Sequence, residues 1–146
     1  MKKTIWFDMD GTIANLYGVE NWLPMLINSD PTPYKLAAPL VNMNKLARTL
    51  NKLQRAGYKL GIISWLSKSS TPEYDEAVTA AKLWWLHKHL NSVKWDVVNI
   101  VAYGHNKWDV CGEGILFDDE APNREAWGDE AFHPAEMMKI LSSLQA

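Results

Sequence analysis

The sequence predicts one α/β domain over residues 1–146, built on an open and mostly parallel β-sheet with helices on both faces. Three observations support this fold class. Four short apolar runs have the character of buried strands, segments with helical spacing separate them, and polar side chains follow the strand ends. The hydrophobic content (47%) and charged content (22%) are ordinary for a globular protein, so the 146-residue chain fits a single core.

The N-terminal half of the chain contains two of these strands with a helix between them. Residues 4–7 are an apolar run followed by acidic residues and a glycine, which suits a buried strand that enters a tight turn. Residues 42–56 place apolar side chains at helical spacing, and Gly57 follows as a natural helix stop. Residues 58–63 then predict a second buried strand that ends at Ser64. A strand, helix, strand order implies a parallel pair with a right-handed crossover.

The C-terminal half continues this alternation. A cap residue, a proline and an acidic residue open a helix that we expect over residues 71–90. Residues 97–103 and 114–117 are two further apolar runs, with a short helix expected around residues 107–111 between them. An amphipathic helix over residues 134–144 closes the chain. The four strands alternating with helices predict a Rossmann-like sheet.

Charge and cysteine content exclude several classes of protein. The net charge is about −2 and no run of Lys or Arg exceeds two residues, so long nucleic acid is not expected as the main partner. Cys111 is the only cysteine, which rules out an intrachain disulfide and a cysteine-based zinc site. The first apolar run is too short for a signal peptide or a membrane span. We therefore expect a cytoplasmic protein without a membrane partner.

Polar side chains gather after the predicted strands. In sheets of this kind, ligands bind beyond the carboxyl ends of the strands. The set combines carboxylates, hydroxyls and an ammonium group: Asp8, Asp10, Thr12, Ser64, Lys107, Asp118 and Asp119. Oxygen ligands suit Mg²⁺, while donors and a positive charge suit phosphoryl oxygens. A plain turn remains an alternative for Asp8–Gly11, but a calcium loop does not, because Val19 occupies the position of its bidentate Glu.

The order of these residues resembles a known family. Residues 7–12, Phe-Asp-Met-Asp-Gly-Thr, resemble the first motif of the haloacid dehalogenase (HAD)-like hydrolase superfamily, a hydrophobic strand followed by DxDGT. Ser64 resembles the second motif of that family, Lys107 the third, and the pair Asp118 and Asp119 the fourth. The resemblance spans nearly the whole chain. It implies a HAD-like core and a phosphatase activity.

The resemblance also implies a role for each acidic residue. Asp8 would attack phosphorus and form an aspartyl-phosphate, while Asp10 would protonate the leaving oxygen and later accept a proton from water. Mg²⁺ would be held by the side chains of Asp8 and Asp118, the backbone carbonyl of Asp10, and waters. Asp119 would orient a ligand water or Lys107.

The remaining motif residues would bind the phosphate. Ser64 would donate a hydrogen bond to it, and Lys107 would neutralise its charge. Lys82 is a rival for the third motif, but it lies inside a predicted helix, whereas Lys107 follows a strand and a turn. Thr12 is expected to fix the turn more than to take part in chemistry. A threonine at that position is typical of the phosphatases of this family and favours hydrolysis over dehalogenation.

An insertion after the first motif is expected to influence the choice of substrate. Residues 15–41 occupy the place of the family's cap, and their aromatic and proline content suits a short lid, although a packed surface loop fits equally well. Trp22, Tyr34 or Trp65 could stack on a nucleobase. Each of these side chains could instead belong to the core.

The position of the insertion, the Asp118-Asp119 pair and the location of Lys107 together resemble the cytosolic 5′(3′)-deoxyribonucleotidase branch of the family. The insertion is shorter than the helical cap of that branch. The favoured function is a nucleoside monophosphatase. A phosphatase that acts on a sugar phosphate or another small metabolite phosphate is the next alternative, and one that acts on a phosphate end of nucleic acid is the third. A non-catalytic module that binds a phosphorylated ligand is the alternative of another class.

Overall fold

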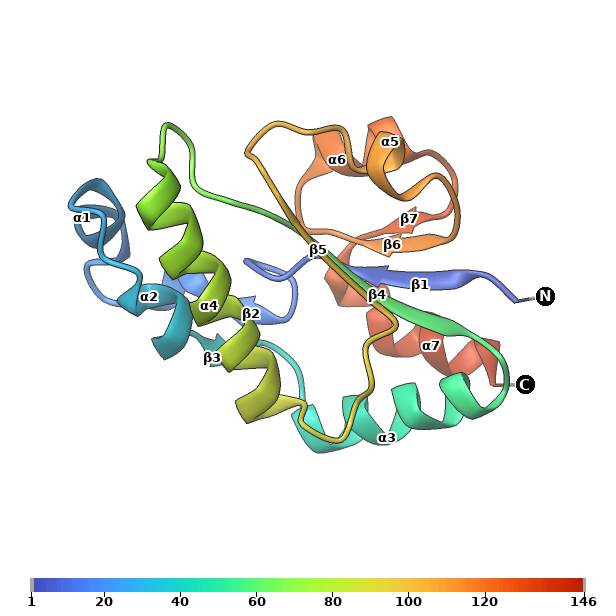
Figure 1. The fold of residues 1–146 in the computed structure, drawn as a ribbon. Coiled ribbons are helices and arrows are strands. Elements are labelled where there is room, and N and C mark those ends of the chain that lie inside the picture. Colours follow the sequence, from blue (N-terminus) through green and yellow to red (C-terminus); the bar gives the residue numbers. More distant parts are fainter. Residues whose placement is uncertain (1, 146) are drawn as a thin grey trace.

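The computed structural model describes residues 2–145 and contains a five-stranded parallel sheet with the order β5-β4-β1-β6-β7 (Figure 1). The strands are β1 (Thr4–Phe7), β4 (Lys59–Trp65), β5 (Val97–Val101), β6 (Ile115–Phe117) and β7 (Ala131–Phe132). The chain winds from β1 to one edge and then returns to continue from β6 on the other side. Strand order therefore reverses between β1 and β6, which is where open α/β sheets bind ligands.

Helices cover both faces of this sheet. On one face lie α3 (Met43–Arg55) and α7 (Met137–Leu144), which contact each other, and the short helix η2 (Pro134–Glu136) leads into α7 (Figure 1). On the other face lie α5 (Lys107–Cys111) and α6 (Ala121–Trp127). The long helix α4 (Pro72–His89) connects β4 to β5. This arrangement confirms the predicted α/β class with a parallel sheet.

The alternation of side chains along β1 explains why both faces need a cover. Ile5 and Phe7 pack in the larger core with residues of α3 and α7, whereas Trp6 packs on the opposite face with Leu116 and Trp127. All of these side chains are almost completely buried. Burial of a large apolar side chain stabilises a fold by about 1.5–3 kcal/mol, so the central strand is fixed from both sides.

The expected strands and helices are found within a few residues of their predicted ends, but the structure adds elements that the sequence did not predict, among them α6 and the short helices of residues 16–36. The sheet has a fifth strand, β7, where the sequence predicted four, because a two-residue strand carries no periodic pattern. The second strand, β4, also continues through Ser64 to Trp65 instead of ending at Ser64. Ser64 is therefore a buried strand residue. Among the described residues, no helix is long and apolar enough to cross a membrane.

The inserted residues 15–41, called the lid segment below, fold into short helices. They form η1 (Leu16–Gly18), α1 (Trp22–Ile27) and α2 (Thr32–Leu36), and β2 (Ala14–Asn15) pairs with β3 (Ala38–Pro39) in antiparallel fashion at the base. The lid segment packs against α4 through a separate small cluster, made of Leu16, Tyr34, Tyr74, Val78 and Ala81. It thus extends from the sheet along the N-terminal half of α4 (Figure 1).

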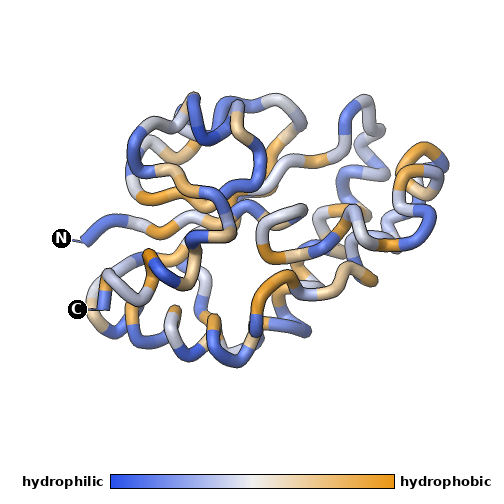
Figure 2. Tube along the Cα trace, turned by 180° about the vertical axis from the view of Figure 1, so that it is seen from behind, coloured by the Kyte–Doolittle hydropathy of each residue, from blue (hydrophilic) through white to orange (hydrophobic). Residues whose placement is uncertain are grey.

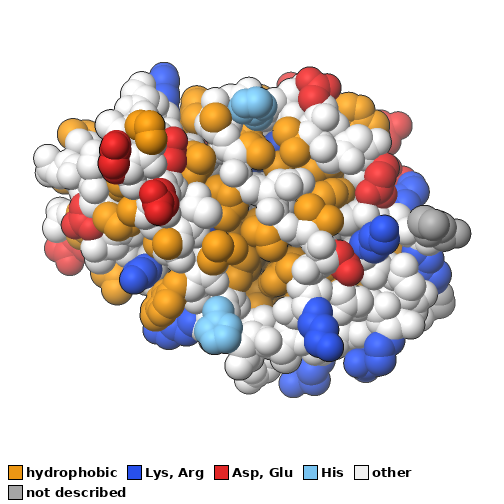
Figure 3. All heavy atoms as spheres, viewed as in Figure 1, with side chains coloured by type: hydrophobic (Ala, Val, Ile, Leu, Met, Phe, Trp, Pro, Cys, Tyr) orange, Lys and Arg blue, Asp and Glu red, His pale blue; other side chains and the backbone are white. Residues whose placement is uncertain are grey.

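Hydrophobic side chains are not confined to the interior. The trace in Figure 2 shows a hydrophobic α1 at the edge of the molecule, where Leu23 is 50% and Ile27 73% exposed. Figure 3 shows hydrophobic side chains gathered near the middle of the opposite view, with most charged side chains around them.

Candidate active site

The turn after β1 presents the first acidic residues. The backbone N–H of Asp8 donates to the carbonyl of Phe117 at 3.0 Å, which holds the end of β1 against β6. The chain then reverses in a tight turn, in which three successive N–H groups donate to the carbonyl of Met9. Gly11 has a φ of +83°, a conformation that favours glycine. This turn places Asp8 and Asp10 at the carboxyl edge of the sheet.

Thr12 ties this turn to the fourth motif. Its hydroxyl donates to Oδ2 of Asp8 at 2.9 Å and accepts from the backbone N–H of Asp119 at 3.2 Å. Thr12 is fully buried and does not line the cavity that opens beside the carboxylates. Its contacts are those of a residue that fixes the relative positions of the two acidic segments.

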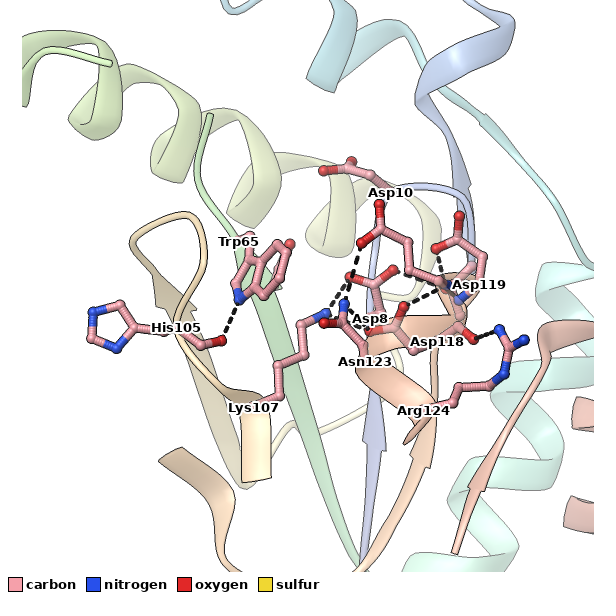
Figure 4. A network of polar contacts seen from close by, with 12 residues as sticks. Asp8, Asp10, Trp65, His105, Lys107, Asp118, Asp119, Asn123 and Arg124 are labelled. Atoms are coloured by element: carbon pink, nitrogen blue, oxygen red, sulfur yellow. Dashed lines mark hydrogen bonds and ion pairs between the residues drawn. The ribbon is translucent and has the colours of Figure 1, made fainter. Parts of the chain in front are cut away.

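Lys107 reaches the same point from the start of α5. Its Nζ donates to Oδ1 of Asp8 at 2.9 Å and to Oδ2 of Asp118 at 2.6 Å (Figure 4). Burial by itself lowers the pKa of Lys107, but the two carboxylates outweigh burial, so that the pKa is raised and the ammonium group stays charged. The side chain also lines the cavity, so it can meet a ligand there.

The two acidic residues after β6 have different surroundings. Asp118 is fully buried and accepts hydrogen bonds from the backbone of Glu120 at 2.9 Å and from the side chain of Asn123 at 3.1 Å. Arg124 donates to the Asp118 backbone carbonyl at 3.0 Å from the side away from Lys107 (Figure 4). Burial and the nearby charge of Asp8 raise the pKa of Asp118 to about 6 and that of Asp119 to about 8.

Three of these carboxylates fit a divalent cation. One oxygen from each of Asp8, Asp118 and Asp119 lies within 4.8 Å of the other two. Burial, together with their crowding, raises the pKa of Asp118 and Asp119, and hard oxygen donors are the ligands that Mg²⁺ prefers. The side chain of Asp10 lies outside this group. The backbone carbonyl that the family resemblance assigns to the metal is a separate atom of that residue.

A second buried lysine faces Asp10. Lys82 of α4 donates to Oδ2 of Asp10 at 3.0 Å, to Oγ of Ser64 at 2.7 Å and to the carbonyl of Trp65 at 2.6 Å. The sequence favours Lys107 over Lys82 for the third motif, and the structure brings both lysines to the acidic residues. The signal for Lys82 was its helical register, because it lies four residues after the buried Val78.

Ser64 lies beneath this contact. It is fully buried and does not line the cavity, and its hydroxyl accepts the hydrogen bond from Lys82. Trp65, the next residue, does line the cavity, and its indole N–H donates to the backbone carbonyl of His105 at 2.8 Å. The end of β4 therefore contributes one residue to the support of Lys82 and one to the cavity wall.

A cavity of about 260 Å³ opens beside the carboxylates. Its wall combines acidic and basic groups of the sheet edge with aromatic residues from the ends of β4 and β5 and from the lid segment. The aromatic members are Tyr17, Trp22, Tyr34, Trp65 and Tyr103. Two pairs of these rings touch, because the centroids of Trp65 and Tyr103 and those of Tyr17 and Trp22 are each 5.0 Å apart. The cavity wall therefore offers aromatic surface to a ligand.

Sequence reasoning named several residues of this wall but not all. Tyr103 and Lys68 were not singled out, although Tyr103 ends an apolar run and Lys68 follows the second motif. Asn123 of α6 lines the cavity, and its side-chain amide donates a hydrogen bond to Asp118. The predicted residues Asp8, Asp10, Lys107 and Asp119 line the cavity directly, whereas Asp118 is covered behind them.

Comparison with known proteins supports the fold. The chain matches no protein-family model and no curated protein sequence. Its structure is similar to that of a D,D-heptose 1,7-bisphosphate phosphatase from Burkholderia thailandensis, with a TM-score of 0.53, 16% identity, and coverage of 86% of this chain and 72% of that one. It is also similar to a chain of the Pnkp1/Rnl/Hen1 complex, with a TM-score of 0.56, 18% identity, and coverage of 91% of this chain and 45% of that one. At these identities, the comparisons show that the chain shares its fold with both proteins.

Proposed function

We propose that this chain is a Mg²⁺-dependent phosphomonoester hydrolase that forms an aspartyl-phosphate on Asp8. The observation that carries the proposal is the meeting of Asp8, Lys107 and Asp118 at the switch point of the sheet, with Asp119 close by. The fold shared with a phosphatase supports the same reaction class.

The charges of the site also favour a bound cation. Four carboxylates, those of Asp8, Asp10, Asp118 and Asp119, face two ammonium groups. When ionised, these carboxylates exceed the lysines by two charges, which is the charge of one Mg²⁺. A bound Mg²⁺ supplies a Lewis acid that withdraws charge from the phosphoryl oxygens. The side chains of Asp8, Asp118 and Asp119 would hold it.

The proposed reaction proceeds in two displacements. A carboxylate oxygen of Asp8 forms a bond to phosphorus, the bond from phosphorus to the ester oxygen breaks, and its electron pair stays on that oxygen. Asp10 gives its proton to the departing oxygen and then takes a proton from the water that releases phosphate. Burial raises the pKa of Asp10, although Lys82 opposes this shift, and a raised pKa suits a group that must carry a proton.

Lys107 is placed to stabilise the phosphoryl group. An ammonium group has three donors, and two of them are used by Asp8 and Asp118. Because the side chain lines the cavity, its third donor is available to a phosphoryl oxygen. The charge of Lys107 thus serves both the nucleophile and the ligand.

The favoured substrate is a nucleoside monophosphate, in keeping with the resemblance to the deoxyribonucleotidase branch. The aromatic residues of the cavity support this choice, because every nucleobase presents a flat face on which Trp65 or Tyr103 can stack. The polar wall residues Ser67, Lys68 and Asn123 favour a second candidate, a sugar or other small metabolite phosphate. The cavity volume of about 260 Å³ suits a small substrate in either case.

The first experiment measures phosphate release from a panel of nucleoside monophosphates and sugar phosphates, with Mg²⁺ or with a chelator. The Asp8→Asn variant is expected to lose activity by roughly a thousandfold or more, because the nucleophile is removed. Asp109→Asn, which changes an exposed aspartate of α5, serves as the control and keeps activity. Lack of release from every compound by the unchanged protein would contradict the proposal.

A second experiment distinguishes the two substrate classes. Tyr103 is 53% exposed and stacks against Trp65, so Tyr103→Ala removes ring surface from the cavity without opening the core. The KM for a nucleoside monophosphate is expected to rise about 5- to 150-fold, the equivalent of about 1–3 kcal/mol of stacking, while the KM for glucose 6-phosphate stays constant. Trp84→Ala changes an exposed ring outside the cavity and is the matched control. Equal effects on both substrates would argue against base recognition.

A further inference from the structure

Lys82 is a buried charge that the proposed reaction does not yet use. It is 1% exposed and lies on α4, which is not part of the strand ends that carry the motifs. We infer that Lys82 is a positioning residue that fixes the carboxyl group of Asp10 for proton transfer to the leaving group. This inference rests on the proposed function and adds to it a role outside the recognised motifs.

The contacts of Lys82 exclude direct binding of substrate. All three donors of its ammonium group have an acceptor: Oδ2 of Asp10 at 3.0 Å, Oγ of Ser64 at 2.7 Å and the Trp65 carbonyl at 2.6 Å. Lys82 does not line the cavity, whereas Lys107 does and has only two such contacts among the described residues. The two lysines therefore have different tasks. Lys107 faces the phosphate, and Lys82 holds the residue beside it.

The surroundings of Lys82 make it a rigid support. Its neighbours on the buried face of α4 include Val78, Trp85 and Leu86, which fix the helix against the core. The ring of Tyr34, from the lid segment, lies 5.1 Å from its Nζ and covers it from the other side. Asp10, by contrast, belongs to a turn after β1 and is partly exposed. The contact with Lys82 therefore fixes the direction of the Asp10 side chain.

Position matters because proton transfer is short-ranged. The carboxyl group of Asp10 must lie within hydrogen-bond reach of the ester oxygen, about 2.6–3.2 Å, when the bond to phosphorus breaks. A leaving group whose alcohol or phenol has a high pKa needs that proton in order to leave, whereas nitrophenol has a low pKa and leaves as the nitrophenolate anion. Loss of positioning should therefore affect poor leaving groups much more than good ones. General damage to the fold affects both alike.

The test compares Lys82→Met with the unchanged protein on phenyl phosphate and on p-nitrophenyl phosphate. The value of kcat/KM is used because it covers the steps up to the first bond cleavage. We expect a loss of about a hundredfold for phenyl phosphate and of less than about fivefold for p-nitrophenyl phosphate, since general acid catalysis contributes about that much to the poor leaving group. Lys88→Met, an exposed lysine on the same helix, is the matched control and should change neither value.

Equal losses for the two esters would overturn the inference, as would no loss for either. Failure of the unchanged protein to hydrolyse either ester would instead contradict the proposed function, so the two failures are distinguishable. If Lys82→Met does not fold, the double variant Lys82→Met/Asp10→Asn removes both charges of the pair. It is compared with Asp10→Asn alone on phenyl phosphate. Equal kcat/KM values support the inference, because Lys82 then acts only through Asp10, and a further loss overturns it.

Discussion

The acidic residues of the site differ most in what holds each carboxylate. Asp8 lies between Lys107 and the hydroxyl of Thr12, and Asp10 faces Lys82. Asp119 has no lysine partner among the described residues, and its side chain lies against Gly11. Its position therefore depends on the shape of the turn after β1.

Gly11→Ala is predicted to weaken Mg²⁺ binding. A Cβ on Gly11 would collide with the carboxylate of Asp119, and the φ of +83° would strain the backbone. We expect the Mg²⁺ affinity, measured by calorimetry, to fall about tenfold or more, as changes next to metal ligands commonly do. Gly112→Ala is the control, because its φ is +73° but nothing lies within 4 Å of the new Cβ.

Both glycine variants should lose about 1 kcal/mol of stability through backbone strain. Only Gly11→Ala should lose affinity for the metal. If the two variants bind Mg²⁺ equally well, Asp119 is not a metal ligand, and the proposed site reduces to Asp8 and Asp118.

At the scale of elements, the lid segment is fastened to α4 and to the loop before it. The hydroxyl of Tyr34 is hydrogen-bonded to Ser67 at 2.7 Å, and the hydroxyl of Tyr74 donates to the carbonyl of Asp30 at 3.1 Å. The β2–β3 pair holds the base of the segment. The aromatic wall of the cavity is thus largely formed before a ligand binds.

The double variant Tyr34→Phe/Tyr74→Phe is predicted to loosen the lid segment without unfolding the sheet. Two lost hydrogen bonds amount to about 2 kcal/mol, so amide exchange over residues 22–36 should become roughly thirtyfold faster. Hydrogen exchange followed by mass spectrometry measures this, with Tyr58→Phe as the control. Tyr58 lies outside the lid segment, near Lys2. Unchanged exchange, or faster exchange in β1 and β4 as well, would show that these bonds do not hold the segment.

At the scale of the whole molecule, the crowded carboxylates couple stability to pH. Burial and neighbouring charges raise the pKa of Asp118 to about 6 and that of Asp119 to about 8, above the ordinary value of 3.8. Between about pH 4 and pH 8 the folded state then binds more protons than the unfolded state. The free energy of unfolding of the metal-free protein must therefore decrease as the pH rises through this window.

Mg²⁺ should reverse this trend, because it binds the ionised carboxylates of the folded state only. We predict that the Tm in a chelator falls from about pH 5 to about pH 8, and that Mg²⁺ raises the Tm more at the higher pH. Thermal unfolding followed by circular dichroism measures both effects. Asp119→Asn should flatten the dependence in the chelator. A Tm that is independent of pH without metal would contradict the raised pKa values of Asp118 and Asp119.

The sequence by itself determined the class of fold and most of the acidic residues of the site. Apolar runs bounded by glycine, proline and acidic residues predicted β1, β4, β5 and β6, because each run is long enough to carry a pattern. Since the carboxyl ends of parallel strands meet at one edge, residues that follow different strands were expected to converge. Asp8, Lys107 and Asp118 do so, over separations of up to 110 residues.

Only the tertiary structure decided the rest. The two-residue strand β7 forms because its backbone pairs with β6 at the edge of the sheet. Lys82 reaches Asp10 across 72 positions of sequence, because the packing of α4 turns its face toward the sheet edge. Ser64, which we expect to bind phosphate, accepts a hydrogen bond from that lysine, a contact that its position in the sequence does not indicate. The local sequence pattern indicates which residues form a helix or strand. How one element is oriented toward another depends on packing between distant segments, and a local pattern does not contain that information.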